Sequence, residues 1–165
     1  QGPALLTLES VDVAADIGTL LSDKVLIRDM RLDGMEVFIE HRGLKNNLYE
    51  VIEPLRRPRE PTGKALLVDT LTIGEVLVHV ALPSLSGESQ SQTIDLKVAP
   101  ITMTDLGRNE RMDTPTLITK VVLAVAAGIA EQHSDILPKE TVSEIRGILD
   151  KALDIGRIIF SGKKD

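Results

Sequence analysis

One alternating pattern of apolar residues occurs twice in this chain, 41 positions apart, and it limits the fold more than any other feature. Within residues 24–41, apolar residues stand two positions apart in three successive stretches, at Val25 and Ile27, Met30 and Leu32, and Val37 and Ile39, and residues 65–82 repeat the pattern. Alternation with a period of two puts every second side chain on the same face of a β-sheet. Sliding the first copy onto the second superposes these apolar pairs: Ile27 on Val68, Met30 on Leu71, Leu32 on Ile73, Val37 on Val78 and Ile39 on Val80.

Each copy is divided at its centre by residues typical of tight turns. Asp33-Gly34 divides the first copy, and Gly74-Glu75 divides the second. An Asp-Gly pair between alternating segments is a strong signal for a β-hairpin. The sequence therefore predicts a curved antiparallel β-sheet built from repeated hairpins. Further strands are expected in residues 4–14 and 93–106, and short helices in residues 16–21 and 46–55.

The character of the sequence changes after residue 113. Asp113 or Thr114 is placed to cap a helix that has Pro115 at its first position and ends at His133. A second helix is expected from Glu140 to Phe160. The first helix is apolar on more than one side, which is typical of a buried helix. Strands followed by helices indicate an α+β fold, with the sheet in residues 4–112 and two long C-terminal helices over it in residues 113–161.

The composition excludes several classes of function but does not point to one. The 165 residues fit one domain, with residues 1–3 typical of a cloning remnant and residues 162–165 of a tail. The net charge of −6 and the 2% aromatic content argue against nucleic acid as a partner. The chain has no cysteine, so disulfides and thiolate chemistry are excluded. The longest apolar run, Val121 to Ala130, is shorter than the about 20 residues that span a bilayer.

Residues able to do chemistry are few and follow no catalytic motif. The sequence has no phosphate-binding glycine loop and no nucleophile elbow. Glu36, Glu40 and His79 alternate with apolar strand residues, so they are expected on the outer face of the sheet as polar pairs between strands. The interpretation is a protein that is not an enzyme, with no catalytic residue, no metal site and no cofactor.

The apolar face of the sheet is the candidate binding site. A phospholipid or fatty acyl ligand would lie along the inward side chains of the strands and beneath the first helix, which would act as a lid. The residues expected to line this apolar groove are Ile27, Leu32, Val37, Ile39, Val78, Val80, Leu117, Val121, Val125 and Ile129. A proline-rich loop carries three arginines that could contact a partner or lipid headgroups: Arg56, Arg57 and Arg59.

The first half of the chain resembles the repeated module near the start of AsmA-like bacterial envelope proteins. The matching positions are Val11, Asp12 and Val13; Leu20, Leu21, Ser22 and Lys24; Val25, Ile27, Met30, Leu32, Gly34 and Val37; and Asn47 and Leu48. The resemblance implies a curved antiparallel sheet with an apolar inner face. It also implies a periplasmic location, an inner-membrane anchor upstream of this chain, and a role in lipid transport or outer-membrane maintenance. Typical members are much longer and continue with strands where helices are expected here.

Two functions remain open from the sequence. The first is a non-enzymatic AsmA-like module that binds lipid or another hydrophobic ligand near a membrane. The alternative is a protein–protein interaction or scaffold domain of the bacterial envelope, whose helices only seal the core. Its partner would be another envelope protein, bound through a sheet edge or the arginine loop.

Overall fold

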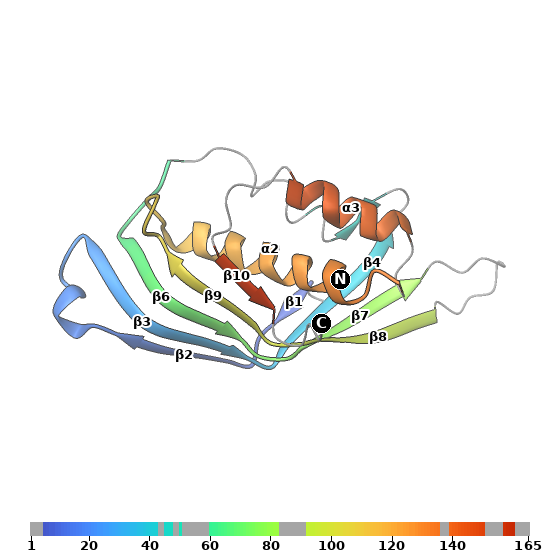
Figure 1. The fold of residues 1–165 in the computed structure, drawn as a ribbon, viewed down its shortest axis with the longest axis horizontal. Helices are drawn as coiled ribbons and strands as arrows, with labels where there is room; N and C mark the ends of the chain where they lie inside the picture. The colour runs from blue at the N-terminus through green and yellow to red at the C-terminus, as the bar shows by residue number, and fades with distance from the viewer. Residues whose placement is uncertain are drawn as a thin grey trace.

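Two β-sheets lie end to end and curve around a long helix (Figure 1). This computed structural model describes residues 5–42, 45–47, 50, 60–82, 92–135, 139–150 and 157–160. Each sheet has five strands. Sheet I has the order β10-β9-β6-β3-β2, and sheet II has the order β1-β4-β7-β8 with β5 beside β4.

The bounds of the strands follow the chain from one sheet to the other. Sheet I contains β2 (Ser10–Ala15), β3 (Lys24–Asp33), β6 (Ala65–Ile73), β9 (Ile101–Leu106) and β10 (Arg157–Phe160). Sheet II contains β1 (Leu6–Thr7), β4 (Met35–Arg42), β5 (Lys45–Asn46), β7 (Val76–Leu82) and β8 (Gln92–Val98). A short 3-10 helix, η1 (Ile17–Thr19), lies between β2 and β3.

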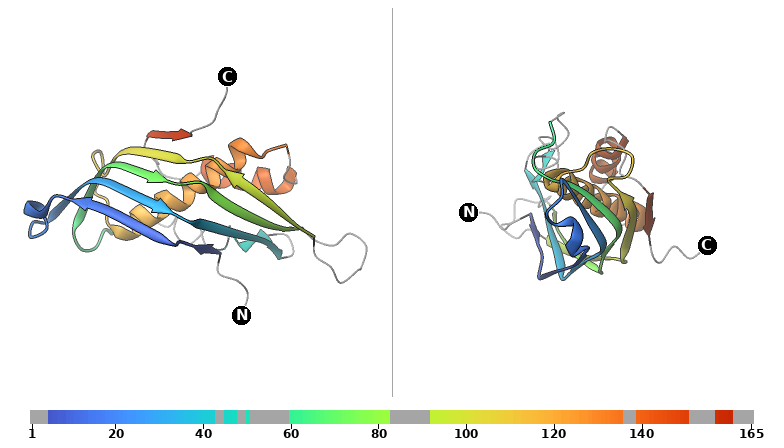
Figure 2. Two further views of the ribbon diagram at one scale, coloured as in Figure 1. Left: turned by 90° about the horizontal axis from the view of Figure 1, so that it is seen from below. Right: turned by 90° about the vertical axis from the view of Figure 1, so that its left-hand side faces the viewer.

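The same four chain segments run through both sheets in the same order. β1 continues into β2, β3 into β4, β6 into β7, and β8 into β9, as the left view of Figure 2 shows. Each segment passes from one sheet to the other at a break of one or two residues. The fold is therefore a set of long strands that bend at a shared line.

The two predicted hairpins are wrong. β3 and β4 do not pair with each other, because β3 pairs in parallel with β6 and β4 pairs in parallel with β7. Both sheets are mixed, since the other strand pairs are antiparallel. The predicted α+β class and the strand segments are confirmed, but a purely antiparallel sheet is not.

The conformation of Asp33-Gly34 explains why the chain bends there without reversing. A two-residue hairpin of the type that Asp-Gly favours needs positive φ at both central residues. Gly34 has φ +67°, whereas Asp33 lies within the extended strand β3. One residue with positive φ produces a kink, and the strand then continues in sheet II. Gly74 lies beside this kink, where its N–H donates to the Leu32 carbonyl at 2.8 Å.

The repeat offset of the sequence is the register of the parallel strand pairs. The structure pairs Ile27 with Val68 and Leu32 with Ile73 in sheet I, and Ile39 with Val80 in sheet II. These are the pairs that the superposed repeats give. The repeat therefore predicts which residues lie side by side, although it does not predict the direction of the strands.

The prediction of two long helices over the sheet is wrong, because only one long helix, α2 (Thr114–Gln132), lies over the inner side of the strands. α2 has Asp113 as its N-cap and a proline in its first turn, as predicted. α3 (Lys139–Asp150) is shorter than the predicted second helix and contacts α2. Residues 157–160 were predicted to be helical but form β10, which pairs antiparallel with β9. Two isoleucines and a phenylalanine in this segment favour a strand, and β10 gives β9 a second partner.

The hydrophobic core lies between the inner face of the strands and α2. The strands curve around this helix, as the right view of Figure 2 shows. Apolar residues of both sheets, α2 and α3 form one buried cluster. Burying this cluster is the main force that stabilises the fold, because the free energy gained is roughly proportional to the apolar area removed from water.

Candidate functional site

The structure brings the ten predicted groove residues together. The six from the strands are buried on the inner face of the sheets, and the four from α2 are buried in the same cluster. The strand residues are Ile27, Leu32, Val37, Ile39, Val78 and Val80, and the helix residues are Leu117, Val121, Val125 and Ile129. The inner face is thus continuous and apolar, and α2 occupies the space along it.

Hydrogen bonds fix α2 at both ends. At the N-terminal end, the Asp113 carboxylate accepts hydrogen bonds from the Thr116 N–H and from the Thr62 N–H, both at 2.9 Å. At the other end, the Gln132 side-chain oxygen accepts from the Ala99 N–H at 2.8 Å. The His133 ring also contacts the Lys97 carbonyl at 2.6 Å. These contacts attach the helix to the segments beside it at each end.

α2 is also long and apolar enough to cross a membrane, the only described helix of which this is true. About two thirds of its apolar stretch, 67%, is buried inside the fold. A core helix of a soluble protein meets the same criteria of length and composition. The observation that matters for function is that an apolar helix covers an equally apolar sheet face.

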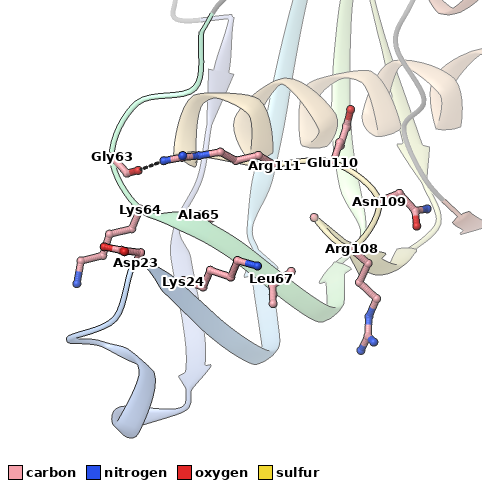
Figure 3. A pocket seen from close by; sticks show the side chains of 11 residues that line it. Asp23, Lys24, Gly63, Lys64, Ala65, Leu67, Arg108, Asn109, Glu110 and Arg111 are labelled. Carbon is pink, nitrogen blue, oxygen red and sulfur yellow. Dashed lines mark hydrogen bonds between the residues drawn. The ribbon is translucent and has the colours of Figure 1, made fainter.

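A pocket of about 870 Å³ opens at the end of sheet I (Figure 3). It lies where β3 and β6 begin and where the chain leaves β9. The wall is rich in charged side chains, with Asp23, Lys24, Lys64, Arg108, Glu110 and Arg111 among its residues. This pocket therefore differs in character from the apolar inner face.

Ion pairs account for only part of the charge in this pocket. The Arg108 guanidinium binds Asp69 at 2.8 Å and Asp105 at 2.9 Å. Glu110 binds Lys120, whose side chain is nearly buried, at 2.7 Å. Lys64 and Arg111 instead donate to the backbone carbonyls of Leu20 and Gly63, which carry no net charge.

In the described wall, three cations remain, Lys24, Lys64 and Arg111, against two negative charges, that of Asp23 and that of the second carboxylate bound to Arg108. The pocket with its ion-pair partners therefore has a small surplus of positive charge, about one unit, on a chain whose net charge is −6, and we call it the electropositive pocket.

Beside the pocket, the turn between β2 and β3 exposes apolar side chains. We call Ile17, Leu20 and Leu21 the apolar tip. Leu21 is 97% exposed, Ile17 81% and Leu20 43%. In Figure 1, η1 lies at one end of the molecule, beyond the strands. A helical turn with Asp16 as its cap was predicted here and is confirmed, but its apolar side chains point to solvent.

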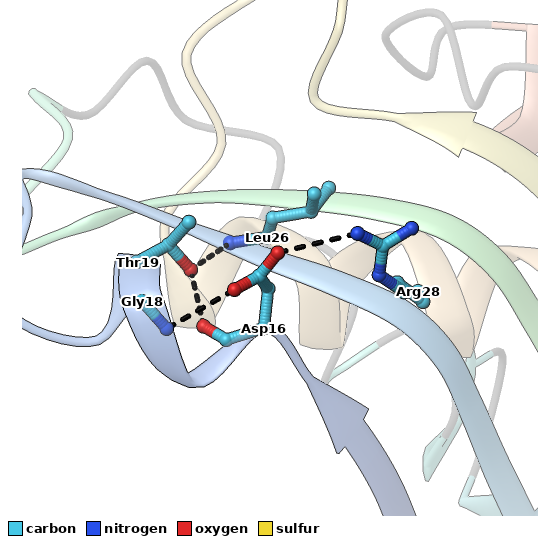
Figure 4. Close-up of polar contacts among 5 residues, drawn as sticks. All are labelled: Asp16, Gly18, Thr19, Leu26 and Arg28. Carbon is cyan, nitrogen blue, oxygen red and sulfur yellow. Dashed lines mark hydrogen bonds and ion pairs between the residues drawn. The ribbon is translucent and has the colours of Figure 1, made fainter.

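Polar contacts give the apolar tip its shape (Figure 4). The Asp16 carboxylate accepts from the Gly18 N–H at 3.0 Å and binds Arg28 at 3.2 Å. The Thr19 hydroxyl donates to the Asp16 carbonyl at 2.7 Å and accepts from the Leu26 N–H at 3.0 Å. The turn is therefore held by hydrogen bonds to its own ends, and its apolar side chains are not needed for packing.

The outer face of sheet II carries the polar residues that the sequence placed there. The His79 Nδ1 donates a hydrogen bond to the Asp95 carboxylate at 2.7 Å, and the Nε2 of the same ring lies 3.8 Å from Glu36. Phe38 stacks on the same ring, with 4.7 Å between centroids. Because opposite ring nitrogens face the two carboxylates, these groups do not converge on one point. Within the described ranges, no cluster of three or more histidine, aspartate or glutamate residues is arranged to hold a metal ion.

The outer face of sheet I carries one titratable group with a displaced pKa. A hydrogen bond from Arg31 to Asp33, together with the negative charge of that carboxylate, raises the pKa of the Arg31 guanidinium above its ordinary value. Arg31 therefore stays charged throughout the physiological range. The predicted contact residues Arg56, Arg57 and Arg59 lie outside the described residues.

Comparison of the chain with family models, curated proteins and solved structures found no match.

Sequence reasoning missed the electropositive pocket and the exposure of the apolar tip. The pocket is formed by segments far apart in the chain, residues 23–24, 63–67 and 107–111, which the parallel pairing of β3 with β6 and the antiparallel pairing of β6 with β9 bring together. For the tip, a signal was present. Leu20 and Leu21 stand between Asp16 and the polar run Ser22-Asp23-Lys24, in a turn too short to bury them.

Proposed function

We propose that this chain is a non-enzymatic, AsmA-like envelope module that holds a lipid or another hydrophobic ligand between its curved strands and α2, beside a membrane. One observation carries the proposal. The inner face is apolar along both sheets, and one apolar helix, α2, covers it. An acyl chain offers the same kind of surface as the leucine, valine and isoleucine side chains that now pack there.

The location belongs to the same proposal. The resemblance implies the periplasm, with an inner-membrane anchor upstream and a role in lipid transport or outer-membrane maintenance. The resemblance implies an antiparallel sheet, whereas the sheets here are mixed. A lipid-binding groove needs an apolar face, and parallel and antiparallel strands can both form one. The second half of the chain adds α2, whose ends are held by hydrogen bonds to Thr62 at one end and to Ala99 and Lys97 at the other. Release of one end would expose the part of the inner face beneath that end to a ligand.

The experiment is native mass spectrometry of the purified protein, followed by organic extraction. We expect a phospholipid or fatty acid bound in stoichiometric amount, which extraction removes. A paired variant, Gln132→Ala/His133→Ala, should load and release that lipid faster, because it frees the C-terminal end of α2. A mass that corresponds to the protein alone, before and after incubation with phospholipid vesicles, would contradict the proposal.

A scaffold domain without ligand is the second candidate, and a specific observation favours it. α2 has 12 buried residues and fills the space along the inner face. Among the described strands, β2 is the outermost of sheet I, and its valines Val11 and Val13 are half exposed. Such an edge can pair with a strand of another protein. Absence of lipid together with a stable complex formed through β2 would support this candidate.

A further inference from the structure

We propose that the apolar tip and the electropositive pocket together form a docking surface for an anionic lipid bilayer. The inference depends on the proposed function, since it identifies the membrane surface beside which the module would handle its ligand. It is carried by the exposed side chains at one end of the molecule, and not by the inner face.

Two of the three apolar side chains of the tip bury little surface in the fold. Leu21 and Ile17 are 97% and 81% exposed, and no other large apolar side chain in the described residues is exposed to this degree. Exposing them is unfavourable in water. The backbone that presents them is nevertheless well fixed, by the Asp16 and Thr19 hydrogen bonds. A rigid turn that projects leucine and isoleucine outward is suited to insertion among lipid headgroups and upper acyl carbons.

The cations lie directly behind this turn. Lys64 donates a hydrogen bond to the Leu20 carbonyl, and the adjacent Ala65 N–H donates to the Asp23 carbonyl at 2.9 Å. The tip and the pocket are thus joined through residues 64–65. Lys24, Lys64 and Arg111 are exposed in the pocket wall. Inserted leucines would bring these cations to the depth of the phosphate groups.

The apolar tip and the cations beside it, taken together, favour an anionic bilayer over a second protein as the binding partner. A second protein would be expected to match the apolar tip with an apolar pocket of its own, which leaves the cations unexplained. An anionic bilayer satisfies both parts, because it offers apolar depth and a negative surface at once. One short turn gives weak binding by itself, and the nearby cations supply the second attraction that stable association needs.

Vesicle flotation tests the inference with the full chain. Wild-type protein should float with vesicles that contain phosphatidylglycerol and much less with vesicles of phosphatidylcholine alone. Added salt should weaken the association, because it screens the charges. The variant Ile17→Ser/Leu21→Ser should bind at least about tenfold more weakly, because it removes the two side chains that would be transferred out of water.

Each test variant has a matched control: Val11→Ser/Val13→Ser is the control for the tip variant, and Lys97→Gln is the control for Lys24→Gln. Val11→Ser/Val13→Ser removes two half-exposed apolar side chains from β2 and should leave flotation unchanged. Lys24→Gln should weaken binding about fivefold, as expected for one cation near an anionic surface. Lys97→Gln, on sheet II and away from the pocket, should have little effect. Circular dichroism confirms that each variant is folded.

Several results would overturn the inference. They are an absence of flotation by the wild-type protein, an equal loss in both serine variants, or a dimer that depends on Leu21 in place of vesicle binding. Native mass spectrometry separates this failure from failure of the proposed function. Lipid-loaded protein that does not float contradicts only the docking surface. Protein that floats through its tip but carries no lipid contradicts only the ligand site.

Discussion

The inner face and the apolar tip use the same kinds of side chain for opposite purposes. On the inner face, isoleucine and valine are buried by strands and helix together, and Ile39 has no exposed surface. At the tip, Ile17 and Leu21 are almost fully exposed on a turn that polar contacts hold in shape. Apolar residues therefore stabilise one region and do not stabilise the other. What remains for the tip is an interaction with something outside the chain.

The largest expected difference between the two regions is in stability. Ile39→Ala should lower the free energy of unfolding by about 2–5 kcal/mol, because it leaves a cavity in the buried cluster. Leu21→Ala should change it by less than about 0.5 kcal/mol, as is usual for exposed positions. Urea unfolding followed by circular dichroism measures both. A comparable loss in the two variants would show that the tip also packs against the fold.

The bend of the inner face depends on Gly34, and a glycine beside the pocket provides its control. Gly34 and Gly63 both have positive φ, +67° and +74°. A β-carbon on Gly34 would lie 2.6 Å from the Glu9 β-carbon, whereas one on Gly63 would meet nothing within 4 Å.

Gly34→Ala should therefore cost about 2–4 kcal/mol, from backbone strain and displacement of Glu9, and Gly63→Ala only about 1–2 kcal/mol. Thermal unfolding compares the two variants. Equal losses would mean that the bend is not tightly constrained by the contact with Glu9.

The N-terminal end of α2 connects the inner face to the segment that leads into the pocket. Asp113 is fully buried and accepts hydrogen bonds from α2 and from Thr62, which precedes the pocket. Asp113→Ala should lower the free energy of unfolding by about 1–2 kcal/mol through loss of the helix cap. Asp113→Asn keeps an oxygen acceptor and should lose less. If the two variants are equally stable, the cap does not contribute to the attachment of α2.

The smallest effect is expected at the tip itself. Asp16→Ala removes the acceptor for Gly18 and the partner of Arg28, both near the surface. Global stability should fall by no more than about 1 kcal/mol. Hydrogen exchange at Gly18 should become faster, while exchange in β4 and β7 should stay as in the wild-type protein. Unchanged exchange at Gly18 would contradict the view that polar contacts shape the tip.

The sequence predicts the apolar faces well and the topology poorly. Alternation identifies the strands, and the offset between the repeats gives the pairing of residues such as Ile27 with Val68. Strand direction does not follow from alternation, because parallel and antiparallel strands can share it. The long connection in residues 43–64 was the available signal, since parallel strands need such a crossover. Asp33-Gly34 led to the wrong prediction of a hairpin, because the same pair of residues can form a hairpin turn or a kink. Which of the two forms depends on whether Asp33 also has a positive φ.

The candidate site could be predicted only where it depends on local pattern. The ten groove residues follow from period two in the strands and from helical spacing in α2. The electropositive pocket could not be predicted, because Lys24 and Lys64 become neighbours only through the parallel register of β3 and β6. The exposure of Leu21 depends on how tightly η1 turns, which apolar spacing does not reveal.

The central claim is that the inner face beneath α2 binds an acyl chain, and photo-cross-linking tests it most directly. The folded protein is loaded with a fatty acid that carries a diazirine on its chain, irradiated, digested and sequenced by mass spectrometry. We predict adducts on β4, β7 and α2, at inward residues such as Val37, Val78 and Val125. Adducts confined to residues 17–21, or no adducts on folded protein, would show that the inner face is only a core.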